Sequence, residues 1–191
     1  DVHGLMGDTP VFYGAINVYL KEKIPLYRKA PMWVEKLLNS ESLLQMASKK
    51  AGSTRAEGLE EMTISTLLGE DGDQANELEH LVAYLKEHVQ PDVVHLSNAL
   101  LLGLARRLKN DLGAAVVCSL QDENEWVDPM RPEYQGKVWD LMAERAKDVD
   151  AFIAASQFYA QKSIDQMKIP AEKVHVVYGG VDLAGYEQSS L

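Results

Sequence analysis

The sequence has little cysteine. Its single Cys118 leaves no partner for a disulfide within the chain. Cys118 lies in the apolar run AAVVCSL, so we expect a buried, unreactive thiol rather than a nucleophile. Scarce cysteine also fits a reducing compartment.

Long apolar runs are missing as well. The longest stretch, ALLLGLA, is too short to cross a bilayer, and no signal peptide opens the sequence. We therefore expect a cytoplasmic protein without a transmembrane segment.

Basic residues are outnumbered by acidic ones, 19 to 29, which gives a formal net charge of −10. Such an excess repels phosphate backbones, so we expect no non-specific binding of nucleic acid. It leaves room for a local basic pocket that binds a phosphorylated ligand.

Several signatures of known chemistry are also missing. The sequence contains no Gly-x-Ser-x-Gly elbow, Walker loop or GxGxxG fingerprint. His80 and His88 lie eight residues apart without a third ligand nearby, so we expect exposed helix positions and no metal site. His95 and His175 fall within predicted strands, and only His95 lies close to the predicted functional edge, where a ligand role stays open.

What is present is a chain of 191 residues with 46% hydrophobic residues, enough for one α/β domain with a substantial core. From residue 92 onward, strands and helices alternate. The strands are predicted at 92–96, 114–120, 151–156 and 174–177, and the helices at 97–113, 136–149 and 156–167. This order predicts a parallel sheet with right-handed crossovers, in a Rossmann-like three-layer domain.

Local signals support these boundaries. Ser97 or Asn98 can cap the first helix, Gly113 can end it, and Ser156 can cap the last one. The strand 114–120 is apolar at almost every position, which predicts a strand covered on both faces. Residues 121–135 are predicted to be a polar loop.

The first ninety residues are mostly helical in pattern, and we interpret about 30–75 as a helical insertion. No strand precedes the segment YGAIN, so the first strand of a doubly wound domain is expected to be absent. At the other end, YGGVDLAGYEQSSL trails off without a further element. Either the chain is a fragment or flanking segments are missing from it, and we favour a fragment.

Open α/β sheets bind ligands where the carboxyl ends of the strands lead into loops. The residues in those positions are Tyr13 to Asn17, Ser97 and Asn98, Gln121 to Glu125, Ser156 and Gln157, and Tyr178 to Asp182. Each set alone is most simply a cap or a turn. Five sets on one edge predict a cleft.

The strings DVVHLSNALLLGLARRL, AAVVCSLQDENEW, DVDAFIAASQFYAQKSI and IPAEKVHVVYGGVD together resemble the N-terminal domain of family-4 glycosyltransferases of GT-B fold, group 1 type. Gly180, Val181 and Asp182 match the family's turn into the interdomain linker. Ser156 matches its strand-Ser-helix step. The resemblance implies a domain at 1–180 and the start of a linker at 181–191.

The resemblance also implies an activity. The full-length protein is expected to be a retaining glycosyltransferase that moves a sugar from a nucleotide-sugar donor to a sugar or small-molecule acceptor. The donor is a substrate, and no cofactor or metal is expected. A missing C-terminal domain would hold most of the nucleotide, so the isolated chain is expected to be inactive as an enzyme.

The implied site residues lie in the loops. Gly14 and Ala15 stand where the family has a Gly-Gly pair, and with Asn17 they form a loop that lets donor phosphate or acceptor approach the backbone, unless it is a plain loop before a helix. Ser97, Asn98 and Ser156 are further predicted donor or substrate contacts.

The loop after the second strand is the most informative one. Gln121 occupies the position where many family members have a His, and Gln cannot titrate near neutral pH. We therefore assign Gln121, the one catalytic candidate, a hydrogen bond to sugar or acceptor rather than proton transfer. Asp122 or Glu123 is predicted to bind a hydroxyl or an amine, the alternative being solvated loop acids.

Two other functions compete with glycosyl transfer. The chain could be a stand-alone, non-catalytic Rossmann-like module that binds a partner through its helical N-terminal half. A sugar-phosphate hydrolase is the weaker alternative, since the sequence shows no nucleophile with its base.

Overall fold

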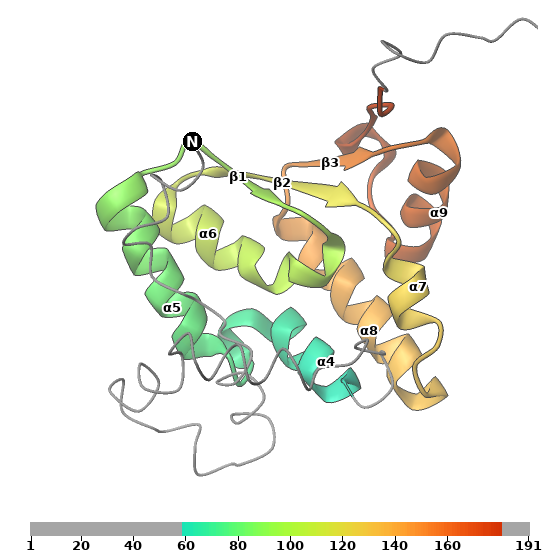
Figure 1. The fold of residues 1–191 in the computed structure, drawn as a ribbon, viewed down its shortest axis with the longest axis horizontal. Coiled ribbons are helices and arrows are strands. Elements are labelled where there is room, and N and C mark those ends of the chain that lie inside the picture. Colours follow the sequence, from blue (N-terminus) through green and yellow to red (C-terminus); the bar gives the residue numbers. More distant parts are fainter. Residues whose placement is uncertain (1–58, 181–191) are drawn as a thin grey trace, which may run out of the picture.

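The computed structural model describes residues 59–180, drawn in colour in Figure 1. Its centre is a four-stranded sheet in the order β1-β2-β3-β4, with every pair of neighbours parallel. The strands are β1 (Val93–Leu96), β2 (Ala115–Leu120), β3 (Ala151–Ala154) and β4 (Val174–Val176). The predicted parallel α/β fold is therefore confirmed.

Each crossover between neighbouring strands contains a helix. The first carries the 3₁₀ helix η5 (Ala99–Leu104) and α6 (Ala105–Leu112), the second α7 (Glu123–Val127), α8 (Pro132–Arg145) and η6 (Ala146–Asp148), and the third α9 (Gln157–Met167) and η7 (Ala171–Lys173). Before the sheet come α4 (Glu60–Leu68), η3 (Gly69–Asp71), α5 (Ala75–Tyr84) and the π-helix η4 (Leu85–Val89).

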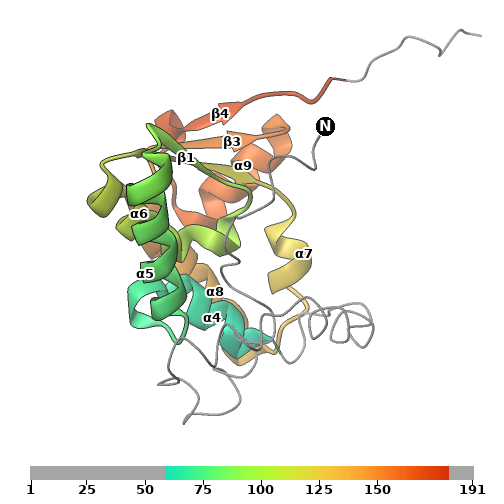
Figure 2. The ribbon, with the colours of Figure 1, turned by 60° about the vertical axis from the view of Figure 1, so that its left-hand side comes forward.

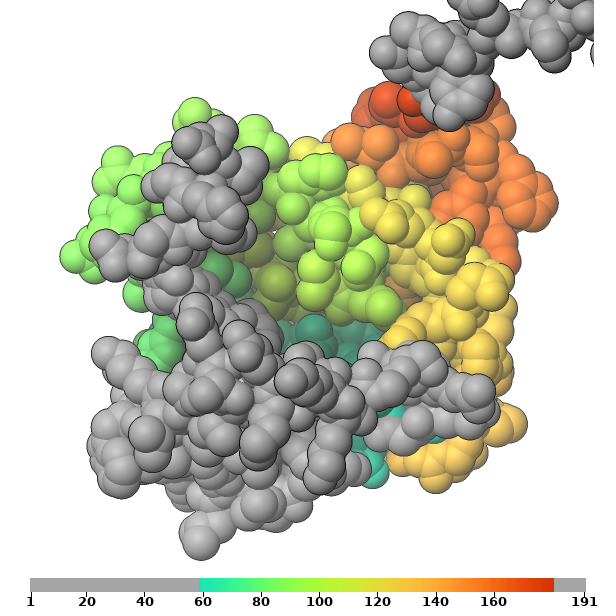
Figure 3. Space-filling view, in the orientation of Figure 1, coloured from blue at the N-terminus to red at the C-terminus, as the bar shows by residue number. Residues whose placement is uncertain are grey.

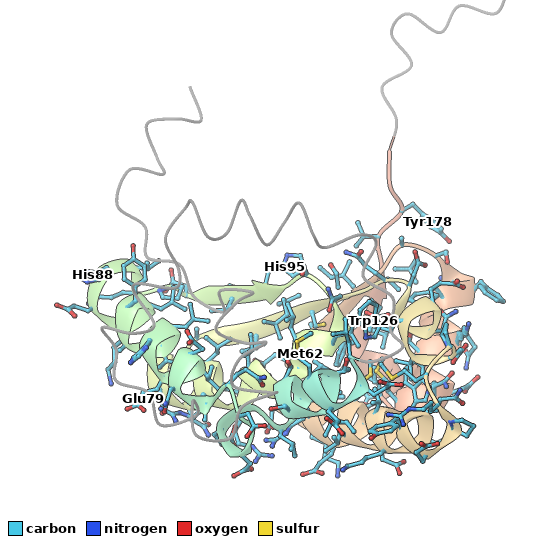
Figure 4. The ribbon with its side chains drawn as sticks, turned by 60° about the horizontal axis from the view of Figure 1, so that its bottom comes forward. Met62, Glu79, His88, His95, Trp126 and Tyr178 are labelled. Carbon is cyan, nitrogen blue, oxygen red and sulfur yellow. The ribbon has the colours of Figure 1, made fainter. Side chains whose placement is uncertain are left out.

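The elements stack in layers. The crossover helices α6, α8 and α9 pack on one face of the sheet, and α4 packs on the far side of α8 and η5 (Figures 1 and 2). Side chains of β2 alternate accordingly, because Val116, Cys118 and Leu120 are buried while Val117 and Ser119 are partly exposed. We predicted that β2 is covered on both faces. The face that carries Val116, Cys118 and Leu120 is buried, whereas the opposite face is only partly covered. On the other face, His95 points away from these helices (Figure 4).

Helix ends follow the signals in the sequence. The Asn98 side chain accepts a hydrogen bond from Leu100 N–H at 3.0 Å, and Ser156 Oγ accepts one from Tyr159 N–H at 3.1 Å. Gly113 ends α6 with φ +69°, a left-handed conformation that glycine adopts without strain. All three predicted boundaries are confirmed.

The predicted polar loop at 121–135 is wrong. The short helix α7 occupies part of it, and α8 begins at Pro132 rather than at Gly136. Proline favours the first turn of a helix, where its missing N–H has no partner to lose. Val127 and Met130 are buried and pack in the hydrophobic core, which fixes the position of this segment.

Some predictions lie outside the described residues. The absent first strand, the loop with Gly14, Ala15 and Asn17, most of the insertion and the linker from Val181 onward belong to 1–58 and 181–191. Burial does raise the pKa of the Cys118 thiol, as expected for a buried and unreactive cysteine.

Two glycines let α4 and η5 approach closely. A Cβ atom on Gly103 would lie 2.1 Å from the Thr66 carbonyl oxygen, and one on Gly69, where φ is +60°, would lie 2.1 Å from the Gly103 carbonyl oxygen. The backbone itself therefore forms this contact, and neither position has room for a side chain.

A buried arginine ties the same region to α8. Arg145 is only 3% exposed, and its guanidinium donates to the Leu68 carbonyl at 2.6 Å and to Glu70 Oε1 at 3.4 Å. Arg106 Nη1 reaches the same Glu70 oxygen at 3.2 Å. Burial alone would raise the pKa of Glu70, but a backbone hydrogen bond and the charges of Arg145 and Arg106 outweigh it and lower that pKa.

We expect Gly103→Ala to lower the free energy of unfolding by about 3 kcal/mol, since the new methyl group would overlap the backbone of α4. The matched control is Gly136→Ala, at an exposed position in α8 where a Cβ atom meets nothing within 4 Å. That change should raise the free energy of unfolding by about 0.5–1 kcal/mol. Urea unfolding of both variants measures the difference, and equal effects would contradict the close contact.

We expect Glu70→Gln to lower stability at pH 7 by about 1–3 kcal/mol, because it removes the carboxylate that Arg145 shares with Arg106 and leaves the buried Arg145 only Asp71, which is 70% exposed. The folded-state pKa of Glu70 lies below its value in the unfolded chain, so its contribution is present above that unfolded pKa. It is lost as pH falls through the folded-state pKa. Between about pH 5 and pH 3 the wild-type chain should therefore lose more stability than the variant. Glu172→Gln, at an exposed position in η7, is the control and should follow the wild type.

Candidate functional site

A cleft of about 750 Å³ lies at the carboxyl ends of β2, β3 and β4. This volume is in the range of small-molecule sites. The walls come from two helices, α7 and α9, which neighbour each other on the surface (yellow and orange in Figure 3). The lining residues are Ser119, Leu120, Gln121, Asp122, Asn124, Glu125, Ile153, Ala155, Ser156, Phe158, Tyr159, Lys162, Val177 and Gly179.

A smaller cavity of about 180 Å³ adjoins it, lined by Asn98, Leu100, Gln121, Asp122 and Glu123. Gln121 and Asp122 line both spaces. The predicted edge thus brings together Asn98, Ser156 and the loop after β2. The Ser97 side chain lines neither cavity, and its carbonyl oxygen accepts a hydrogen bond instead. Ligand binding by these residues stays a prediction.

Glu123 is the fixed point between the loops. The residue is only 3% exposed. Oε1 accepts from Ala99 N–H at 2.8 Å and from Gln121 N–H at 3.1 Å. Oε2 accepts from Gln121 N–H at 3.0 Å and from the Tyr159 hydroxyl at 2.6 Å. Both oxygens therefore have protein donors, and a carboxylate oxygen has few further sites to offer.

This geometry changes the role of Glu123. It is not a solvated loop acid, and its carboxylate is already committed to protein donors. We revise its predicted role from ligand binding to positioning, because it links the turn after β1, the turn after β2 and α9. Asp122, which is exposed, is the carboxylate of the predicted pair that faces both cavities.

Tyr159 completes the link from the α9 side. Its hydroxyl donates to Glu123 Oε2 and accepts from Glu123 N–H at 2.9 Å. Burial and this carboxylate raise the pKa of Tyr159 above its usual range. The phenol therefore stays protonated at physiological pH and serves as a hydrogen-bonding group in the wall of the cleft.

Gln121 has a fixed orientation. Its Nε2 donates to the Ser97 carbonyl at 2.8 Å, and its backbone N–H is held by Glu123. No described residue donates to its Oε1, which can therefore accept a hydrogen bond from a ligand. An amide held in this way can orient a hydroxyl group but cannot take up a proton.

Some lining residues were missed in the sequence. Phe158, Tyr159 and Lys162 follow the predicted Ser156 cap, and a signal for them existed in the aromatic pair in the first turn of a helix at the predicted ligand edge. Asn124 and Glu125 belong to the predicted set Gln121 to Glu125, but the helix that holds them, α7, was not predicted.

The histidines within residues 59–180 lie on four different elements, α5, η4, β1 and β4. His95 Nε2 is 2.8 Å from Ser119 Oγ, and Ser119 lines the cleft, so His95 is connected to the site through one hydroxyl. His175 and His88 are exposed. Within residues 59–180, no group of three or more His, Cys, Asp or Glu residues could hold a metal ion.

We expect Tyr159→Phe to lower the free energy of unfolding by about 1–3 kcal/mol, since it removes one of the two donors to Glu123 Oε2 and leaves Glu123 N–H without its acceptor. Amide hydrogen exchange should show faster exchange at Glu123 N–H, which the tyrosine oxygen protects. Tyr178→Phe is the matched control, because Tyr178 is exposed and should change stability by less than about 0.5 kcal/mol. Equal stability of the two variants would contradict the role given to Tyr159.

Comparison with known proteins bears on this site. Neither a curated protein nor a solved structure matches the chain. No described helix is long and apolar enough to pass through a membrane. A family model described as Glycosyltransferase Family 4 matches residues 72–184, more than half of the chain and nearly all of the sheet domain described above. The chain therefore belongs to glycosyltransferase family 4.

Proposed function

We propose that the chain is the N-terminal, acceptor-side domain of a retaining glycosyltransferase that uses a nucleotide-sugar donor. The observation that carries this proposal is the position of the cleft. It lies at the carboxyl edge of the parallel sheet, within the segment matched by the family.

The lining of the cleft suits an acceptor better than a nucleotide diphosphate. The described lining residues include two carboxylates, those of Asp122 and Glu125, and one ammonium group, that of Lys162. Carboxylates accept hydrogen bonds from hydroxyl groups but repel phosphates. The donor diphosphate is then held mostly by a second domain, and closure of the two domains excludes water from the reaction.

Gln121 would act by orienting a hydroxyl group. Gln121 lines both cavities, its Nε2 donates to the Ser97 carbonyl, and no described residue donates to its Oε1. Proton transfer falls to other groups, since an amide does not titrate near neutral pH. A non-catalytic module remains the competing function, because the family's titratable residue is replaced at this position.

The test uses the full-length protein with a panel of nucleotide sugars and sugar acceptors. We expect transfer with at least one donor, and retention of the anomeric configuration in the product, measured by proton NMR. Neither transfer nor donor hydrolysis with any nucleotide sugar would contradict the proposal and favour the non-catalytic module. An inverted product would overturn the retaining mechanism alone.

Gln121→Ala should lower kcat/KM by about tenfold, the loss of one hydrogen bond to substrate, with an unchanged pH profile. Gln161→Ala, on exposed α9 surface outside the cleft, is the matched control and should leave kcat/KM unchanged. A shifted pH profile in Gln121→Ala would show that the Gln121 region governs proton transfer, contrary to the proposal.

A further inference from the structure

The α9 wall of the cleft presents an aromatic ring to solvent. Phe158 is 78% exposed, the highest value among the exposed large hydrophobic residues of the described chain. Two others, Val177 and Tyr178, lie at the same end of the sheet, and Tyr178 extends away from the helices (Figure 4). Phe158 and Val177 line the cleft. A cluster of this kind beside a cavity indicates a surface that is covered when a ligand binds.

The facing α7 wall has a different chemistry. Asp122 and Glu125 are exposed carboxylates that line the cleft, and Asn124 Nδ2 donates to Glu125 Oε1 at 3.2 Å. Carboxylate oxygens only accept hydrogen bonds, so this wall is suited to groups that donate them. Gln121 Oε1 adds one more acceptor beside it.

The two walls fit one kind of ligand. A sugar ring has an apolar face of C–H groups, which packs on an aromatic ring, and a rim of hydroxyl groups, which donate to carboxylates. An alkyl chain would leave the α7 wall without partners. A phosphate on the ligand would face two carboxylates and only one ammonium, that of Lys162.

We propose that the cleft binds an uncharged sugar ring as acceptor, stacked on Phe158 with its hydroxyl groups donating to Asp122 and Glu125. This inference rests on the proposed function for the role of the sugar, but the binding itself can be measured without a donor. Phe158 is then a specificity-determining residue, and Asp122 and Glu125 select against phosphorylated sugars.

The experiment measures binding of methyl glucoside, methyl mannoside and methyl galactoside, and of glucose, mannose and galactose 6-phosphates, to the chain by saturation-transfer NMR. We expect at least one neutral sugar to bind, with about tenfold weaker binding of its 6-phosphate because of the carboxylates. Tighter binding of the phosphate, or no binding of any neutral sugar, would overturn the inference.

Variants locate the site. Phe158→Ala should weaken binding of the neutral sugar by about fivefold, and Phe158→Trp should retain it, because the ring rather than the residue is required. Asp122→Asn combined with Glu125→Gln should narrow the difference between neutral and phosphorylated sugars. Val93→Ala removes an exposed apolar side chain at the opposite end of the sheet and should change nothing. If Phe158→Ala does not change the affinity for the neutral sugar, the proposed stacking is contradicted.

The outcomes separate this inference from the proposed function. If the full-length protein transfers sugar but no neutral sugar binds through Phe158, only the inference fails. If neutral sugars bind through Phe158 and no nucleotide sugar is turned over, the proposed function fails and the sugar is a ligand without being an acceptor.

Discussion

The geometry of the cleft depends on one buried carboxylate. Glu123 joins the turns after β1 and β2 to α9 through Ala99 N–H, Gln121 N–H and the Tyr159 hydroxyl. Burying an ionised group without donors would be costly, so the loops must stay where the carboxylate is satisfied. The residues next to these anchors, Asp122 on one side and Phe158 on the other, form the two walls. Their separation is thus set by hydrogen bonds within the protein.

A second constraint joins this edge to the rest of the molecule. The backbone contact between Gly69 and Gly103 and the hydrogen bonds of Arg145 attach α4 to η5 and α8. Residues 60–71 precede the segment matched by the family, yet Ile64 and Leu67 are buried in the same core as Leu102. The start of η5, which carries Ala99 and so meets Glu123, is therefore supported from both sides. Packing outside the matched segment contributes to holding the site.

The sequence was sufficient for features that rest on local signals. Strands followed from apolar runs, and the caps at Asn98, Gly113 and Ser156 followed from side-chain chemistry that acts within a few residues. Helix α7 could not be found in this way, since five residues with one buried apolar side chain, Val127, show no period. The hydrogen bond between Tyr159 and Glu123 joins residues 36 positions apart, and no pattern in the sequence around either residue indicates it. Polar pairs of this kind depend on the fold already being formed, which is why the edge was predictable and its anchor was not.

On the proposed function, the geometry also restricts where a proton can go. Gln121 is held by Ser97 and cannot accept one, and Tyr159 keeps its own proton because its pKa is raised. Ser119 lines the cleft and connects it to His95, but it belongs to β2 rather than to the α7 wall, where the two carboxylates lie. The acceptor hydroxyl would therefore pass its proton to Asp122 or Glu125, or to the departing phosphate oxygen of the donor. A carboxylate that orients the hydroxyl is well placed for the first route, and the replacement of a titratable residue by Gln121 is then compatible with catalysis.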